Sequence, residues 1–501
     1  MTTFSALRTG ACLTALLTGQ AAMADVTARQ VWDAWQGSFS AYGPDATLTT
    51  GAEDDSSGTL TVSDLNFRFD DGTSVMSATV PEIVFRENGD GTVTVDMANS
   101  MSMAMTGDDG TEIDISLTIS GDDTQVSGTP EAMSLAITAD QYVIAVDRLV
   151  SPGGPVDGDI RFALNAVNGS YDITTGDIRD TRYDLKAESV DILVDVASPQ
   201  DDGTVMLSGK IEGIATAGSM SAPADMDFSD PTAMFGGSFS AGGSYTTGPA
   251  AYIIAIDSPE AKVSGTSTSG PGTLAASIGA DGVNYEGSVS DVAVELTSSE
   301  IPFPLKLSAS SYGFGIAMPL GPTDAPVPFK LKLDLSDLSV NDEVWAMADP
   351  AGTFPHDPAT VRIDLSGAAQ LDTNLTDPAG MEAMAASTKF PGKLESLNLN
   401  ELTVDAVGLR IDGTGAFTFD NSDTTTFQGM PRPEGKVTLD VVGINKLIDN
   451  LVAMGLVPED QVMMGRMMVG MFATPTGDDA LQSVIEINAQ GQVMANGQRI
   501  R

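Results

Sequence analysis

Apolar and polar side chains alternate strictly along Ile113-Asp114-Ile115-Ser116-Leu117-Thr118-Ile119. A period of two is typical of a β-strand with one face in a core and the other in water. Residues 65–69 and 331–335 have the same pattern. Turn signals separate such segments: Asp71-Gly72, Asn88-Gly89-Asp90-Gly91, Asp109-Gly110, Asp202-Gly203 and Asp281-Gly282. We therefore predict a mainly β protein, built as a long antiparallel meander or curved sheet.

A helix is predicted at the N-terminal end of this sheet. Thr27 and Gln30 have the spacing of a capping box, and Val31, Trp35 and Phe39 recur on one helix face. We expect the helix to seal the end of the β core. A helix that docks on a membrane surface or a partner is the alternative, although it lacks the basic residues of such helices.

Further helices are predicted only towards the C-terminus, because the pattern shows hardly a convincing helix between residues 44 and 376. Residues 377–387 form a short helix in this interpretation, and residues 445–454 and 460–472 form two longer ones. The helix at 445–454 has one apolar face, made by Leu447, Ile448, Leu451 and Val452. Residues 483–496 are predicted to close the chain as a hairpin.

Length and charge limit the classes of protein. The chain has 501 residues, with 24 basic and 69 acidic side chains, one histidine and one cysteine. We divide it into a signal peptide (1–24), an N-terminal helix with a β-rich region (25–300), and a β-rich region with C-terminal helices (301–501). The net charge of -45 excludes nucleic acid as a general partner, because phosphates would be repelled. The single histidine and cysteine exclude most metal sites and most nucleophile–base pairs.

The first residues are typical of an export signal. Arg8 provides a positive charge, residues 11–22 are mostly apolar or small, and Ala22-Met23-Ala24 has the pattern of a cleavage site. Lipid attachment at Cys12 is a weaker alternative, because Thr9 stands where a leucine is expected. We expect a periplasmic protein that starts at Asp25 and has no transmembrane helix, since no later segment is apolar over about 18 residues.

A search for catalytic and metal-binding residues yields no candidate. His356 lies between prolines and is interpreted as a loop residue. The Asp-Gly sites are interpreted as hairpin turns. In particular, the loop around Asn88 fails as a calcium site because Arg86 and Met97 occupy the first and last ligand positions. We therefore predict no catalytic, cofactor-binding or metal-binding residues, no cofactor and no enzymatic activity, with carboxylate-based hydrolysis as the only chemistry that the composition permits.

Methionine is in excess at two places. Met101, Met103 and Met105 share one strand face, and a second group lies along the predicted C-terminal helix: Met463, Met464, Met467, Met468 and Met471. Methionine is a flexible filler of cores, and we predict that role for both groups. The alternatives are a surface that accepts lipid or a variable apolar partner, and a thioether site for Cu(I).

One segment carries a resemblance to a known family. It contains Trp345-Ala-Met-Ala-Asp349-Pro350, then Phe354-Pro355-His356-Asp357-Pro358, then Arg362-Ile-Asp364-Leu365-Ser366-Gly367. This resembles the signature of an uncharacterised alphaproteobacterial envelope family, domain of unknown function 2125. The opening residues 27–32 and the segment 443–448 are also similar to that family. The resemblance implies an envelope location and a β-rich architecture, but no mechanism.

The region from about residue 391 onward is more loosely similar to AsmA-like envelope proteins. That resemblance implies a long curved sheet whose apolar inner face can cover lipid, and fold alone does not establish function. Our first hypothesis is an exported β-rich envelope protein that covers lipid or another apolar ligand. The second is a structural or interaction protein that binds another envelope component. The third is a carboxylate-based hydrolase.

Overall fold

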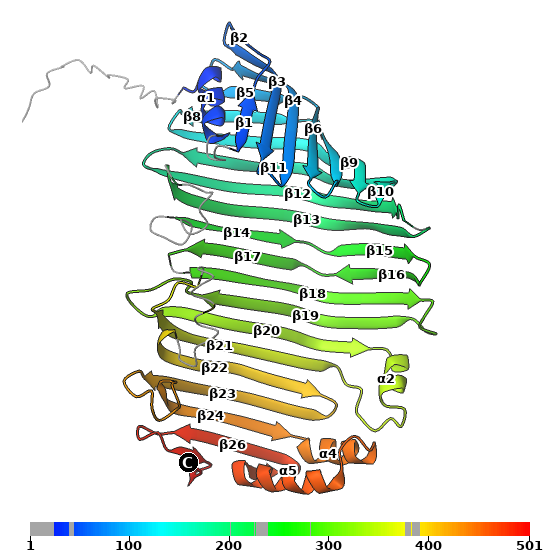
Figure 1. Cartoon of the computed structure of the whole chain (residues 1–501), viewed down its shortest axis with the longest axis vertical. Coiled ribbons are helices and arrows are strands. Elements are labelled where there is room, and N and C mark those ends of the chain that lie inside the picture. The colour runs from blue at the N-terminus through cyan, green and yellow to red at the C-terminus, as the bar shows by residue number, and fades with distance from the viewer. Residues whose placement is uncertain are drawn as a thin grey trace, which may run out of the picture.

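The computed structural model describes residues 25–39, 45–200, 202–224, 226, 239–280, 282–375, 382 and 391–501. Its strands form one long antiparallel sheet (Figure 1). They lie side by side in nearly the order of the sequence, from the blue N-terminal end to the red C-terminal end. The prediction of a mainly β protein with an antiparallel meander is confirmed.

The helices in the described residues are α1 (Ala28–Phe39), α2 (Asp342–Ala348), α4 (Ile444–Ala453) and α5 (Glu459–Phe472). The strands of the N-terminal half are β1 (Ala46–Thr49), β2 (Ala52–Ser56), β3 (Thr59–Asp70), β4 (Ser74–Glu87), β5 (Val93–Met97), β6 (Ser100–Gly107), β7 (Glu112–Ser120), β8 (Asp123–Thr129), β9 (Ala132–Ser151), β10 (Gly154–Val156), β11 (Gly158–Thr174), β12 (Ile178–Ala197), β13 (Thr204–Pro223) and β14 (Ser240–Thr247). Those of the C-terminal half are β15 (Ala250–Asp257), β16 (Lys262–Ser269), β17 (Gly272–Gly279), β18 (Gly282–Ser298), β19 (Leu305–Met318), β20 (Val327–Val340), β21 (Ala359–Leu371), β22 (Gly392–Ala406), β23 (Leu409–Asp420), β24 (Arg432–Val442), β25 (Thr474–Gly477), β26 (Ala480–Ile487), β27 (Val493–Ala495) and β28 (Gln498–Arg499).

Several rows of the sheet consist of two short strands placed end to end. One half of β4 pairs with β5 and the other half with β6, and β9 pairs with β8 and β7 in the same way. Further along, β13 pairs with both β14 and β15, and β18 pairs with both β17 and β16. The long strands from β18 to β24 then pair consecutively, and β24 pairs with β26.

The N-terminal end of the sheet holds the main core. Thr27 and Gln30 form the predicted capping box, in which each side chain accepts a hydrogen bond from the other residue's backbone N–H. Val31 and Trp32 of α1 are fully buried. The ring of Phe85 on β4 lies 6.0 Å from that of Trp32, centroid to centroid. The prediction that this helix seals the end of the β core is confirmed.

At the C-terminal end, α4 and α5 follow the predicted ranges to within a residue. The four apolar residues predicted for one face of α4 are half-buried, whereas Lys446 and Asp449 are exposed. The hairpin is also present, as β26 and β27. The helix α2 was not predicted, and it falls inside the region where a convincing helix was not expected.

Some predictions lie outside the described residues. These are the signal peptide at residues 1–24 and nearly all of the helix at residues 377–387. The strands on either side of the predicted boundary at 300/301 pair with each other along their length, β18 with β19. The division into 25–300 and 301–501 stays a prediction. In the described part of the chain, no helix has the length and apolar character needed to cross a membrane.

Candidate functional site: the apolar face of the sheet

One side of the sheet carries apolar side chains along its whole length. Directly opposed residues of neighbouring strands point to the same side, so a row can be followed from strand to strand. One row reads Phe85, Val95, Thr124, Ile137, Gly169, Leu185, Thr216, Tyr245, Leu274, Gly287, Phe314, Leu333, Ile363, Leu402, Gly413, Leu439 and Ser483. At about 4.8 Å between strands, this row is roughly 75 Å long. We call this side the apolar face.

Much of the apolar face is open to solvent. Leu331 on β20 is 48% exposed, and Tyr312 on the neighbouring β19 is 46% exposed. Ten large apolar residues on this face are exposed in the same way: Met103, Met105, Ile144, Val205, Tyr245, Tyr285, Tyr312, Ile316, Leu331 and Leu333. They extend over strands from β6 to β20. Soluble monomeric proteins rarely expose a contiguous apolar surface of this extent.

A line of pairing gaps crosses the sheet from strand to strand. In several strand pairs, one or two residues of each strand are left out of the pairing along this line, and the register is the same on either side of it. The residues with positive φ along this line are Asp64 (51°), Gly121 (63°), Ala166 (49°), Gly213 (72°), Asp291 (49°) and Asp337 (54°). A positive φ is uncommon for a residue with a Cβ, so its repetition along this line marks a regular interruption of the strands.

The apolar face continues on both sides of this line because the alternation of side chains is reset at each pairing gap. On β12, Leu185 and Ala187 precede the gap, and Val190 and Ile192 follow it, so the spacing between apolar positions changes from two to three. Four buried residues from β7, β9, β11 and β12 pack together along the line: Ile119, Ala139, Val167 and Ala187. The two halves of the sheet therefore share one apolar face.

Glycines on this face are covered by aromatic rings of neighbouring strands. A Cβ at Gly209 would come within 2.3 Å of Tyr252 Cδ1, and one at Gly367 within 2.3 Å of Phe329 Cζ. Each ring therefore occupies the space that a side chain would need, as in the aromatic rescue of strand glycines. This arrangement lets aromatic rings lie across neighbouring strands.

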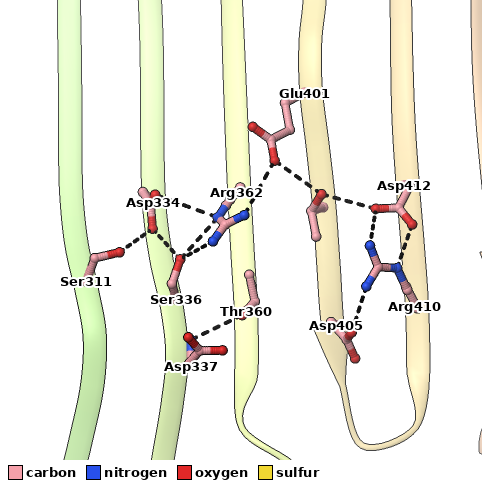
Figure 2. Close-up of polar contacts among 11 residues, drawn as sticks. Ser311, Asp334, Ser336, Asp337, Thr360, Arg362, Glu401, Asp405, Arg410 and Asp412 are labelled. Atoms are coloured by element: carbon pink, nitrogen blue, oxygen red, sulfur yellow. Dashed lines mark hydrogen bonds and ion pairs between the residues drawn. The ribbon is translucent and has the colours of Figure 1, made fainter. Parts of the chain in front are cut away.

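The opposite side of the sheet is polar. Figure 2 shows a network on β19 to β23, in which Asp334 accepts hydrogen bonds from Ser311 (3.0 Å) and Ser336 (2.6 Å). Arg362 donates to the Ser336 hydroxyl through Nε (3.1 Å) and Nη2 (2.9 Å). Arg410 donates to Asp412 through Nε at 2.7 Å. These contacts hold Arg362 and Arg410 next to carboxylates of this network.

The network lies beside a shallow cavity of about 520 Å³, which Arg362, Glu401, Asp405, Arg410 and Asp412 help to line. The hydrogen bond from Arg410 holds the pKa of Asp412 below its ordinary value. That direction is the opposite of what a general acid requires, because a catalytic acid must keep its proton near neutral pH.

His356 is held in a loop by its neighbours. Its ring stacks on Trp345, with 4.4 Å between centroids and 6° between planes, and its Nε2 lies 3.9 Å from Asp349 Oδ2. The Asp349 side chain is buried and accepts a hydrogen bond from the Phe354 N–H at 2.7 Å. These backbone contacts, with the nearby histidine, keep the pKa of Asp349 below its ordinary value. The geometry supports the interpretation of His356 as a structural loop residue.

The Asp-Gly sites in the described residues are hairpin turns. Asp90 accepts hydrogen bonds from the N–H and hydroxyl of Thr92 within the turn between β4 and β5. Asp71 makes the same contacts with Thr73, and together with Ser74 these lower the pKa of Asp71 to about 2. Among the described residues, no three His, Cys, Asp or Glu side chains converge as a metal site would need.

The methionines correct the prediction of core packing. Met463, Met467 and Met471 form a stripe on the outer side of α5 and are 72%, 69% and 59% exposed. The side chains of Met464 and Met468 lie outside the described residues. Met103 and Met105 are partly exposed on the apolar face, and only Met101 of that group packs against a buried cluster. Spacing alone could not distinguish the two outcomes, because a surface stripe and a core stripe have the same period. The alternative of an adaptable apolar surface agrees better with these positions.

Comparison with known proteins places the chain in a family. A model of the family described as uncharacterized protein conserved in bacteria, DUF2125, matches residues 249–498. The chain belongs to this family. The DUF2125 match contains the Trp345–Gly367 segment and begins just before β15, so it covers the C-terminal half of the apolar face. The resemblance of residues 27–32 to DUF2125 and that of the C-terminal region to AsmA-like proteins stay predictions. No curated protein matches the chain.

Proposed function

We propose that this protein is exported to the periplasm and that the apolar face of its sheet covers lipid chains or another apolar ligand. The observation that carries the proposal is the exposure of large apolar side chains on central strands, such as Leu331 and Leu333 of β20. Central strands normally bury one face against a second layer. Each methylene that a ligand buries on such a surface contributes about 0.8 kcal/mol.

The composition of the first 24 residues supports export, because it combines a basic residue, an apolar run and a small-residue cleavage pattern. The acidic polar side supports the same account. Because one side of the sheet is charged and the other is apolar, an apolar ligand would bind only on the apolar side. A protein of this kind would act by binding rather than by catalysis.

The test is lipid extraction and native mass spectrometry of the protein purified from its own cells. We expect co-purified lipid in the wild type and its loss in the double variant Leu331→Glu/Leu333→Glu. The matched control is Lys332→Glu, which adds an acid to the same strand on the polar side. A wild type free of lipid, or equal lipid in all three proteins, would contradict the proposal.

A second candidate function is an interaction protein of the cell envelope. The exposed stripe of Met463, Met467 and Met471 on α5 favours it, because flexible methionine surfaces adapt to apolar partners. A photo-crosslinking residue at position 467 would then capture one defined protein in cells, and the same residue at the half-buried position 469 would not. Cross-linking to many unrelated proteins would reject this candidate.

A carboxylate-based hydrolase is the third alternative. It requires two acids whose pKa values are separated in opposite directions. In the polar cavity, Arg410 bonds to both Asp405 and Asp412, and it lowers the pKa of Asp412. We therefore rank this alternative below the two binding functions.

A further inference from the structure

The apolar face carries one charged residue at a defined place. From β9 to β26, among the paired strand positions that the structure describes, Arg179 is the only charged side chain on this face. It stands near the start of β12, opposite Ala222 of β13. The neighbouring Arg182 of the same strand points to the polar side, opposite Ser219.

Arg179 lines a cavity of about 280 Å³ at the N-terminal end of the apolar face. Ala34 of α1 forms one wall, and Met133 and Ile173 of the apolar face form another. The cavity therefore lies where α1 closes the face, and apolar groups make up most of the wall around one cation. Sites for small molecules have this composition, with an apolar lining and a few polar groups that fix the orientation of the ligand.

A buried hydroxyl lies next to this arginine on the same face. Thr181, two residues along β12, is 6% exposed, and its Oγ1 has no hydrogen-bond partner in the described part of the chain. Thr181 is directly opposite Ile173, which lines the cavity. A buried hydroxyl without a hydrogen-bond partner destabilises the fold. A ligand oxygen that accepts a hydrogen bond from Thr181 would remove this free-energy cost.

We propose that Arg179 and its cavity bind the carboxylate head of a fatty acid, whose chain then lies along the apolar face. The inference rests on the proposed function and names the class of ligand. A guanidinium matches a carboxylate in a planar, two-pronged geometry. The small cavity takes the head and the first part of one chain. The remainder of the chain reaches the exposed side chains of the face.

The experiment uses the full chain and cis-parinaric acid, a fluorescent fatty acid, as the bound probe. Laurate, methyl laurate and dodecyl phosphate, which have equal chain lengths, compete for the site. We expect laurate to displace the probe at a concentration about tenfold lower than methyl laurate, the size of one charge-assisted hydrogen bond. This comparison uses the unmodified protein, so it does not depend on the folding of a variant.

Two variants then locate the charge. Arg179→Leu should remove the advantage of laurate over methyl laurate, and Arg182→Leu, on the other side of the same strand, should keep it. Equal displacement by the acid and the ester in the wild type would overturn the assignment of Arg179 and leave the proposed function standing. A preference for dodecyl phosphate that depends on Arg179 would overturn the carboxylate in favour of a phosphate head. Failure of all probes to bind would overturn both the inference and the proposed function.

Discussion

Phe329 of β20 lies across Gly367, the residue directly opposite it on β21. A Cβ at residue 367 would come within 2.3 Å of Phe329 Cζ and equally close to the Ser396 carbonyl oxygen. Gly367→Ala should therefore lower the free energy of unfolding by about 1–3 kcal/mol, the usual cost of overpacking. Urea unfolding measures this change. Gly321→Ala is the control, because no atom lies within 4 Å of its Cβ position, and an equal loss in both variants would contradict the account.

The line of pairing gaps predicts opposite effects of the same substitution at two alanines of β11. Ala166 has a positive φ of 49°, which costs a residue with a Cβ about 1–2 kcal/mol. Ala166→Gly should raise the urea midpoint because it removes this strain. Ala163 lies in the regular part of the strand. Ala163→Gly should lower the urea midpoint, because it should lower the free energy of unfolding by about 0.5–1 kcal/mol. A loss of stability in both variants would show that residue 166 is not strained.

The helix α1 should account for much of the stability of the N-terminal end. Trp32 is fully buried, and its indole N–H donates to Glu53 at 3.1 Å. Trp32→Ala should destabilise the protein by about 3–5 kcal/mol, as for other large core deletions. The exposed Asp33 provides the control, and Asp33→Ala should change the free energy of unfolding by less than about 0.5 kcal/mol. A Trp32→Ala protein as stable as the wild type would contradict the assigned core.

Asp349 predicts a dependence of stability on pH. Its pKa is lower in the folded protein than in the unfolded chain, chiefly because the Phe354 N–H bonds to its carboxylate. The stabilisation is therefore fully present above the unfolded pKa of about 3.9 and is lost as the pH falls through the folded pKa. Asp349→Asn should lower the urea midpoint at pH 7, and the difference from the wild type should shrink below about pH 4.

The control for this pH dependence is Asp357→Asn, which replaces an exposed aspartate of the same loop. At pH 7 it should change the free energy of unfolding by less than about 0.5 kcal/mol, as for other exposed surface residues. A difference between Asp349→Asn and the wild type that stays constant across the pH range would show that the carboxylate of Asp349 does not stabilise the fold through its charge.

The sequence predicted the strands and both terminal regions because these depend on local patterns. The capping box of Thr27 and Gln30 and the apolar face of α4 are short-range features, and the structure has both. The line of pairing gaps also leaves a signal in the sequence, in the spacing of three between Ala187 and Val190 where two is expected. That signal can be interpreted only when neighbouring strands are aligned, which requires knowledge of the pairing.

The exposure of the apolar face could not be predicted in this way. An alternating strand has the same sequence pattern whether a second layer covers its apolar side or leaves it open. The same holds for Met463, Met467 and Met471, whose spacing fits a buried or an exposed helix face. Arg179 was missed because its side of the sheet depends on the register of β12 with β13, and a shift of one residue would place it on the polar side.

The most direct test of the central claim is site-specific photo-crosslinking in cells at two adjacent residues of β20. A photoreactive amino acid at position 333 lies on the apolar face, and one at position 332 lies on the polar side of the same strand. The account predicts that mass spectrometry finds adducts of lipid mass at position 333 and none at position 332. Protein adducts without lipid at position 333, or lipid adducts equal at both positions, would contradict it.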